Sequence, residues 1–131
     1  ESESENSAKE LARLVITEQM KVTTQTKNNI VYITIQGSID SNTAGELQSR
    51  IMEELTSCNR VIMDLTAVVF LSSAGLRVLL MLYRQLNANG GKVLLVNVSE
   101  EICDIMSMTG FINFFELYAS IEEAEKQFIQ T

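Results

Sequence analysis

The sequence predicts a single α/β domain in which helices pack on a mixed β-sheet. From residue 30 onward, segments with strand patterning alternate with segments of helical periodicity. Two of the strand segments are apolar runs, which is typical of strands covered on both faces. A length of 131 residues, 46% of them hydrophobic, suffices for one ordinary core.

The first two predicted strands, residues 20–26 and 30–36, form a hairpin around an Asn-Asn turn signal. In the second strand Val31, Ile33 and Ile35 alternate with polar or amphipathic residues, so one side of this strand is expected to be buried. A helix follows over residues 41–55, because apolar residues recur there on one helical face. Those residues are Ala44, Leu47, Ile51 and Leu55, and Thr43 and Glu46 at the helix start have the spacing of a capping box.

The middle of the chain predicts a buried strand over residues 60–65, a short connection, and a largely buried helix that runs to about Asn87. The Asn-Gly-Gly segment at residues 89–91 is a helix stop signal. A second apolar strand follows over residues 92–98.

The last quarter of the chain predicts two more helices with a short strand between them. Ser99 caps the first helix and Gly110 ends it. The strand lies within residues 111–117, and Ser120 begins the final helix with a capping box. The large apolar residues around the strand are expected to pack in the core: Met106, Met108, Phe111, Phe114 and Phe115.

Residues 1–19 are set apart from the predicted domain of residues 20–131. They are acidic, and Ser7-Ala8-Lys9-Glu10 fits a capping box followed by an apolar stripe, which predicts a brief helix. Met20 has the character of a natural domain start. The sequence leaves three origins open for the extension: a cloning remnant, a native extension, or the end of an upstream segment.

Composition excludes several functions. The net charge of −7 disfavours nucleic acid as a partner, because phosphate binding needs clustered lysine and arginine. The chain contains no histidine, which removes Ser-His-Asp and Cys-His catalytic pairs and histidine-ligated metal sites. It also lacks a glycine-rich phosphate loop. The sequence therefore predicts no metal, no cofactor and no enzyme activity.

The sequence also indicates the cellular location of the protein. No apolar run approaches the roughly 20 residues that a membrane helix needs, and the acidic start is unlike a signal peptide. Cys58 and Cys103 lack metal-binding spacing, and nothing in the sequence supports a disulfide between them. We interpret both as reduced thiols of a cytoplasmic protein.

The segment Asp64–Leu76 carries the strongest functional signal. It reads Asp-Leu-Thr-Ala-Val-Val-Phe-Leu-Ser-Ser-Ala-Gly-Leu and joins the buried strand to the helix. Ser72 and Ser73 lie where the helix begins. A serine at this place commonly caps free backbone amides. The amides and the positive dipole end of a helix also accommodate a phosphate.

This segment resembles the phosphorylation segment of bacterial anti-sigma factor antagonists, which consist of or contain a STAS domain. The shared pattern is an aspartate, an apolar residue and a small residue, followed by an aromatic and an aliphatic residue before the target serine, then a small residue, glycine and leucine. Upstream, Gly37-Ser38-Ile39-Asp40 resembles the Gly-x-Leu-Asp signature of the family. The resemblance spans roughly residues 20–128 and implies a STAS-like single domain.

The resemblance implies phosphorylation at Ser73, with the adjacent Ser72 as the alternative acceptor. Many family members carry an aspartate directly before the target serine, and Ser72 occupies that position here. The small residues Ala74 and Gly75 would leave the hydroxyl open to a kinase. The competing interpretation is that Ser73 only caps the helix.

The other partner-binding candidates follow from the same resemblance. In the family, the residue that Asp40 matches takes part in contact with the partner kinase, although Asp40 could simply cap the following helix. Ser38, Asn42 and Thr43 could add polar contacts or be ordinary loop residues. Arg77 and Arg84 could contact a partner or belong to a solvated face. Asp40, Ser73 and the turn at residues 97–99 each follow a strand, so we expect them at one end of the sheet.

The resemblance thus predicts an anti-sigma factor antagonist, which is not an enzyme. In the family, the unmodified protein binds an anti-sigma factor that is also a serine kinase, and this frees the sigma factor. Phosphorylation releases the antagonist, and a serine phosphatase resets it. Two alternatives stay open: a STAS module that is never phosphorylated, from a sensor complex or an anion transporter, and a small α/β enzyme.

Overall fold

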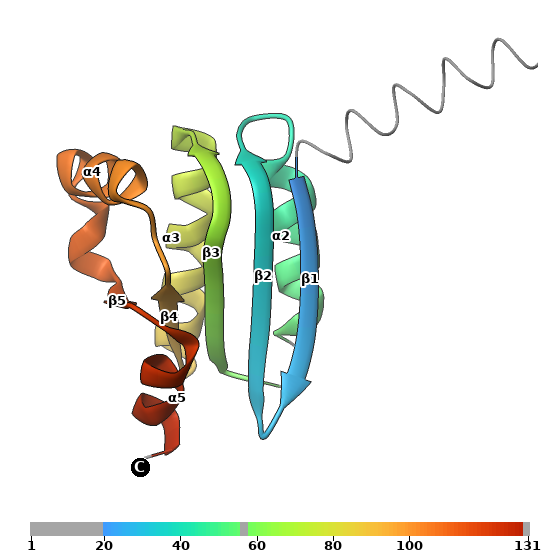
Figure 1. Cartoon of the computed structure of the whole chain (residues 1–131). Helices are drawn as coiled ribbons and strands as arrows, with labels where there is room; N and C mark the ends of the chain where they lie inside the picture. Colours follow the sequence, from blue (N-terminus) through green and yellow to red (C-terminus); the bar gives the residue numbers. More distant parts are fainter. Residues whose placement is uncertain (1–19, 56–57, 130–131) are drawn as a thin grey trace, which may run out of the picture.

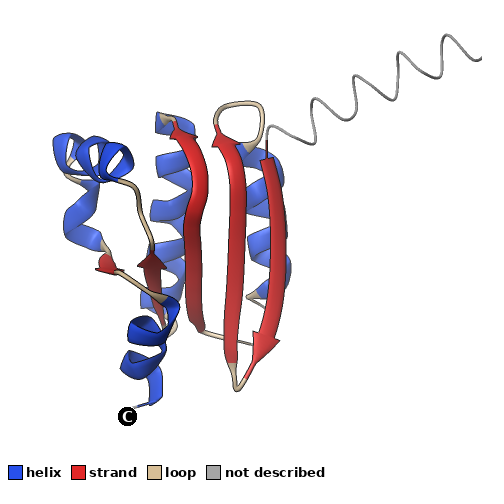
Figure 2. Cartoon of the chain, in the orientation of Figure 1, coloured by secondary structure: helices blue, strands red, loops and turns tan. Residues whose placement is uncertain are grey.

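The computed structural model describes residues 20–55 and 58–129, so the helix expected within residues 1–19 lies outside the described residues. Five strands form one sheet in sequence order. The first two strands are antiparallel and all later neighbours are parallel, so the sheet is mixed, as predicted (Figure 2). The strands are β1 (Met20–Lys27), β2 (Ile30–Ile39), β3 (Arg60–Leu71), β4 (Lys92–Val96) and β5 (Glu116–Tyr118).

Helices cover the two faces of this sheet unequally (Figure 1). Three helices pack on one face and enclose the larger hydrophobic cluster, whereas the last helix covers a smaller cluster on the other face. The described helices are α2 (Ala44–Glu54), α3 (Ser73–Ala88), α4 (Glu100–Thr109), the 3₁₀ helix η1 (Phe111–Phe114) and α5 (Ile121–Ile129). The predicted α/β class is confirmed.

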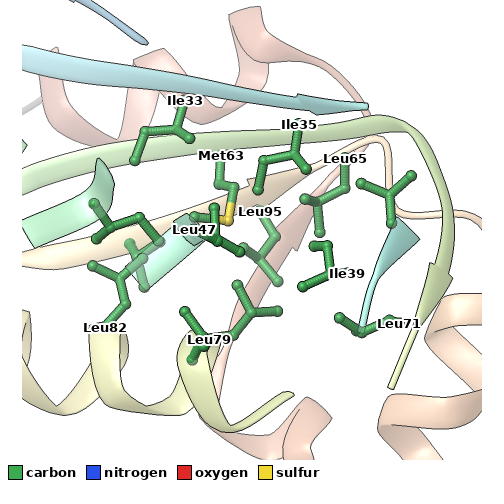
Figure 3. Packing of buried hydrophobic residues seen from close by; sticks show 14 of the residues in the cluster. Ile33, Ile35, Ile39, Leu47, Met63, Leu65, Leu71, Leu79, Leu82 and Leu95 are labelled. Atoms are coloured by element: carbon green, nitrogen blue, oxygen red, sulfur yellow. The ribbon is translucent and has the colours of Figure 1, made fainter. Parts of the chain in front are cut away.

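The larger core is built on a row of residues that crosses the three central strands. Ile33, Met63 and Leu95 are register partners on β2, β3 and β4. Leu47 of α2 and Leu79 of α3 belong to the same cluster (Figure 3). All five side chains are completely buried. This row fixes both helices against the sheet and so determines where their first residues lie.

Both apolar segments predicted as buried strands are internal in the sheet. Residues 61–64 of β3 and residues 94–96 of β4 each have a hydrogen-bonded strand on both sides. β4 ends two residues before the predicted boundary. The reason is Asn97, whose φ of 57° lies in the left-handed region and takes the chain out of the ladder.

β3 is longer than the sequence predicts, because the expected connection at residues 66–71 is a continuation of the strand. Two register shifts against β2 each insert an extra residue on β3, which is the pattern of a β-bulge. Leu65, Val68 and Leu71 therefore all face the core, while the residues between them are exposed. Because buried residues recur here at every third position and not at every second, the alternation typical of a strand does not identify the second half of β3 in the sequence.

The predicted turns and helix ends are largely confirmed. Asn28 and Asn29 have φ of 55° and 64°, the positive values that suit a two-residue hairpin turn. The hydroxyl of Ser99 accepts a hydrogen bond from the N–H of Ile102 at 3.2 Å and caps α4. Gly110 ends α4 in the left-handed conformation, with φ of 79°.

Two of the residues expected in the core lie outside it. Met106 and Phe115 are buried and Phe111 is partly buried, but Met108 is 85% exposed and Phe114 is 44% exposed. Met108 follows Met106 by two positions, which places it roughly 200° around the helix and away from the core. Phe114 closes the 3₁₀ turn η1, where helical periodicity no longer applies.

Candidate partner-binding site

The ends of β2 and β3 place Asp40 and the serine pair beside each other. Ile39 is the register partner of Leu71, and the N–H of Ser72 donates to the carbonyl oxygen of Ile39 at 2.9 Å. Asp40 directly follows Ile39, and Ser73 is the second residue after Leu71. Both therefore lie at the same end of the sheet, as expected (Figure 1).

The turn at residues 97–99, which was also expected at this end of the sheet, lies only partly there. β4 ends at Val96, which pairs with Asp64 rather than with the last residue of β3. The turn at residues 97–99 therefore starts well before the end of β3, and the chain reaches the upper end of the sheet only with α4 (Figure 1). The predicted position is therefore confirmed for Asp40 and Ser73 but is wrong for Asn97.

The structure separates the roles of the two serines. Ser72 is the N-cap of α3: it is half-buried, and its hydroxyl accepts a hydrogen bond from the N–H of Gly75 at 3.3 Å. Ser73 is the first residue of α3, is exposed, and has a hydroxyl without a hydrogen-bond partner among residues 20–55 and 58–129. The capping role therefore belongs to Ser72, and Ser73 carries the accessible hydroxyl.

Loss of the Ser72 cap should be measurable as lost stability. We expect Ser72→Ala to lower the free energy of unfolding by about 1 kcal/mol, because the first turn of α3 loses its side-chain acceptor. Ser73→Ala removes only an exposed hydroxyl and should change stability by less than about 0.5 kcal/mol. Urea unfolding of both variants compares them directly. Equal losses would mean that Ser72 does not act as the cap.

Gly75 allows the start of α3 to approach the end of β2. A Cβ atom at this position would lie 2.7 Å from Ile39 Cγ2, 2.7 Å from Leu71 Cδ1 and 2.9 Å from the carbonyl oxygen of Ile39. A side chain therefore does not fit without a shift in the backbone or in the core. The absence of a side chain at Gly75 lets α3 pack closely enough to hold the serine pair beside the Asp40 loop.

The loop between β2 and α2 is held by Asp40 and Thr43. Asp40 Oδ1 accepts from the N–H of Asn42 at 2.9 Å and from the N–H of Thr43 at 3.2 Å. The hydroxyl of Thr43 accepts from the N–H of Asp40 at 2.9 Å and donates to the carbonyl oxygen of Ser38 at 2.9 Å. This network fixes the direction in which the loop leaves β2.

These bonds correct two expectations. Thr43 is the N-cap residue of α2, but its side chain makes no capping bond to the helix, so the predicted capping box with Glu46 is wrong. The hydroxyl is instead used inside the loop. Thr43 is only 4% exposed and Gly75 is buried, so both support the surface from beneath. Asp40 stabilises the turn before α2 and is not its N-cap.

The remaining candidates lie at the surface to different degrees. Arg77 is exposed one turn into α3, and Ala74 and Ser38 are half-buried. α3 carries two arginines and no acidic residue, and its first turn contains no acidic side chain. The positive dipole end of this helix is therefore not balanced by a carboxylate of its own.

Histidine, cysteine and acidic side chains form no group of three that could hold a metal ion in residues 20–55 and 58–129. Both cysteines are free thiols. Burial, together with the nearby Asp104 and Glu100 carboxylates, raises the pKa of the Cys103 thiol, so it is a poor nucleophile. Within the same residues, each helix is too short or too polar to cross a membrane.

Together these features define a small α/β domain in which the exposed hydroxyl of Ser73 and the half-buried carboxylate of Asp40 lie at the same end of the sheet. The chain belongs to the STAS domain family, whose model matches residues 21–124.

Relatives and solved structures agree with this assignment. BtrV of Bordetella bronchiseptica, provisionally named an anti-sigma factor antagonist, is 28% identical over 110 residues, which is 83% of this chain and 95% of BtrV. An anti-sigma factor antagonist from Mycobacterium paratuberculosis superposes with a TM-score of 0.76 at 25% identity, over 84% of this chain and 94% of that one. Unphosphorylated SpoIIAA, another anti-sigma factor antagonist, gives a TM-score of 0.74 at 19% identity, over 85% and 98%.

SpoIIAA has also been solved in its phosphorylated form. That structure superposes on this chain with a TM-score of 0.65 at 20% identity, over 82% of this chain and 98% of SpoIIAA. The same fold is therefore found in a phosphorylated protein.

Proposed function

We propose that this protein is an anti-sigma factor antagonist, a regulator and not an enzyme, whose binding is switched by phosphorylation of Ser73. The observation that carries the proposal is the exposed hydroxyl of Ser73 at the start of α3, beside the Asp40 loop; this hydroxyl has no hydrogen-bond partner among the residues that the structure describes. The names of BtrV and the other relatives support the antagonist role. The phosphorylated form of SpoIIAA supports the modification.

The partner in this proposal is an anti-sigma factor that is also a serine kinase. The unmodified protein binds it through Asp40, Ser73 and Arg77 and thereby frees the sigma factor. The kinase then transfers the γ-phosphoryl group of ATP to the Ser73 oxygen, ADP leaves, and the hydroxyl proton goes to a base in the kinase. A serine phosphatase hydrolyses the phosphate. The protein supplies no cofactor and acts in the cytoplasm.

The fold accommodates the modification at this position. A phosphate on Ser73 would lie at the positive dipole end of α3, where anions are stabilised. It would add about −1.5 to −2 charge beside the Asp40 carboxylate, on a protein whose net charge is already −7. We therefore expect the phosphate to leave the stability of the fold unchanged and to weaken binding of the partner at this surface.

Phosphosite mapping tests this proposal. The full chain is incubated with ATP and a serine kinase shown to bind it, and the modified residue is identified by mass spectrometry. We expect phosphate on Ser73 in the wild type and in Ser72→Ala, and none in Ser73→Ala. Phosphate on Ser72 would correct the site but keep the mechanism. If a kinase that binds the domain modifies neither serine, the proposal fails and the unmodified STAS module replaces it.

A further inference from the structure

A hollow of about 290 Å³ lies at the opposite end of α3 from Ser73. It is lined by the last turns of α3, the start of β4, η1 and the start of β5. Asn87, which borders it, follows Ser73 by fourteen positions, so the pocket lies about 21 Å along the helix from the serine. The volume lies just below the roughly 300 Å³ at which the range of ligand pockets begins, so only a small ligand fits.

The floor and one wall of this pocket are apolar and aromatic. Val93 and Phe115 are buried beneath it. The rings of Tyr83 and Phe114 stand side by side with centroids 5.5 Å apart, and Tyr83 also contacts Phe115 at 5.7 Å. Phe114 remains 44% exposed at the mouth. A planar ring entering the pocket would cover this exposed aromatic surface.

The rim of the pocket carries hydrogen-bonding groups that the fold does not use. The side-chain amides of Asn87 and Asn113 and the hydroxyl of Tyr83 have no hydrogen-bond partner within residues 20–55 and 58–129. A purely apolar ligand would take these groups from water without replacing their bonds, which is unfavourable. The rim therefore fits a ring that has donors and acceptors on its edge.

The charges at the rim favour a neutral ligand. Lys92 Nζ lies 2.7 Å from Glu116 Oε2, so each charge already has a partner. The hydrogen bonds from Lys92 and from the Tyr118 hydroxyl hold the pKa of the Glu116 carboxyl below its usual value, so this carboxylate stays ionised. An anionic ligand would meet that carboxylate on a protein of net charge −7.

We propose that this pocket binds a neutral, planar heteroaromatic compound of the size of a purine base or nucleoside. The ring stacks on Phe114 and Tyr83, and its polar edge hydrogen-bonds to the amides of Asn87 and Asn113. The site is separate from the Ser73 surface and does not depend on the function proposed for it.

An NMR titration of the full chain with adenosine tests the site. We expect saturable amide shifts at Lys92, Asn113 and Phe114, and none at Asp40 or Ser73. Phe114→Ala should weaken adenosine binding about tenfold, because a stacking partner is lost. Phe70→Ala is the matched control, since Phe70 is also an exposed aromatic residue but lies outside the pocket, and it should leave the affinity unchanged.

Two further probes test the ligand class. Asn113→Leu keeps the branching and the number of heavy atoms of the side chain but removes the amide, so it should weaken the binding of adenosine and leave the binding of indole unchanged. AMP, which adds a phosphate to the same base, should bind more weakly than adenosine. The proposal is overturned if millimolar adenosine causes no saturable shifts at the pocket, or if Phe114→Ala and Phe70→Ala bind it equally well.

Discussion

Gly75→Ala is expected to lower the free energy of unfolding by about 1–3 kcal/mol, the usual cost of an overpacked core. The new methyl group would meet Ile39 Cγ2 and Leu71 Cδ1 at 2.7 Å, and both side chains are fully buried with little room to move. It would also meet the carbonyl oxygen of Ile39 at 2.9 Å. That oxygen accepts the bond from the Ser72 N–H, so relief requires the start of α3 to move away from β2.

Gly45→Ala is the matched control for this prediction. Gly45 also lies in the first turn of a helix, but a Cβ atom there would have no neighbour within 4 Å. Alanine should therefore stabilise the protein by about 0.4–1 kcal/mol through the lower entropy of the unfolded chain. If the packing is as described, urea unfolding should show a lower free energy of unfolding for Gly75→Ala than for the wild type, and a higher one for Gly45→Ala. A Gly75→Ala protein as stable as Gly45→Ala would show that α3 does not need the close approach.

Phosphorylation of Ser73 should weaken binding to the partner kinase at least tenfold, which corresponds to about 1.4 kcal/mol or more. The cause is the added charge, about −1.5 to −2, at a surface where Asp40 already lies close by. Ser73→Asp should weaken binding by less, because a single carboxylate carries less charge and fewer acceptor oxygens than a phosphate. Isothermal titration calorimetry with the kinase measures both.

Two controls make the binding experiment decisive. Ser49→Asp introduces the same charge at an exposed position in the middle of α2, away from the sheet edge, and should bind as the wild type does. Thermal unfolding of the phosphorylated protein should match that of the unmodified one, because the phosphate lies at the favourable end of α3. Wild-type affinity in the phosphorylated protein would contradict the switch.

The parts of the fold that sequence could predict depend on local signals. The hairpin follows from two asparagines that tolerate positive φ, and the ends of α4 follow from Ser99 and Gly110. The second half of β3 could not be predicted, because its bulges depend on pairing with β2, which is distant in sequence. The capping box at Thr43 was predicted wrongly for a different reason: its hydroxyl donates to the carbonyl oxygen of Ser38 within the preceding loop, and the residue spacing does not distinguish this bond from a helix cap.

The candidate site could also be predicted only in part from the sequence. The Asp64–Leu76 segment predicts a hydroxyl at a helix start, but adjacent serines have equal capping chemistry, and only the observed start of α3 assigns the cap to Ser72. An aspartate at that position would also be a good N-cap, so the serine preserves the helix start. The aromatic pocket was missed because Phe114 lies in a 3₁₀ turn, whose exposure no helical or strand period predicts.

The two halves of β3 differ in how firmly the backbone is held. Arg60–Asp64 pairs with β4, and residues 61–64 also pair with β2, but from residue 67 to Leu71 the strand pairs with β2 alone. A segment bonded on one side opens at a lower free energy than one bonded on both, so local unfolding should begin at the end of β3 that leads into Ser72. The serine is thus attached to the most easily opened part of a central strand. An enzyme that must draw this residue into its own active site would have to separate only one row of backbone hydrogen bonds.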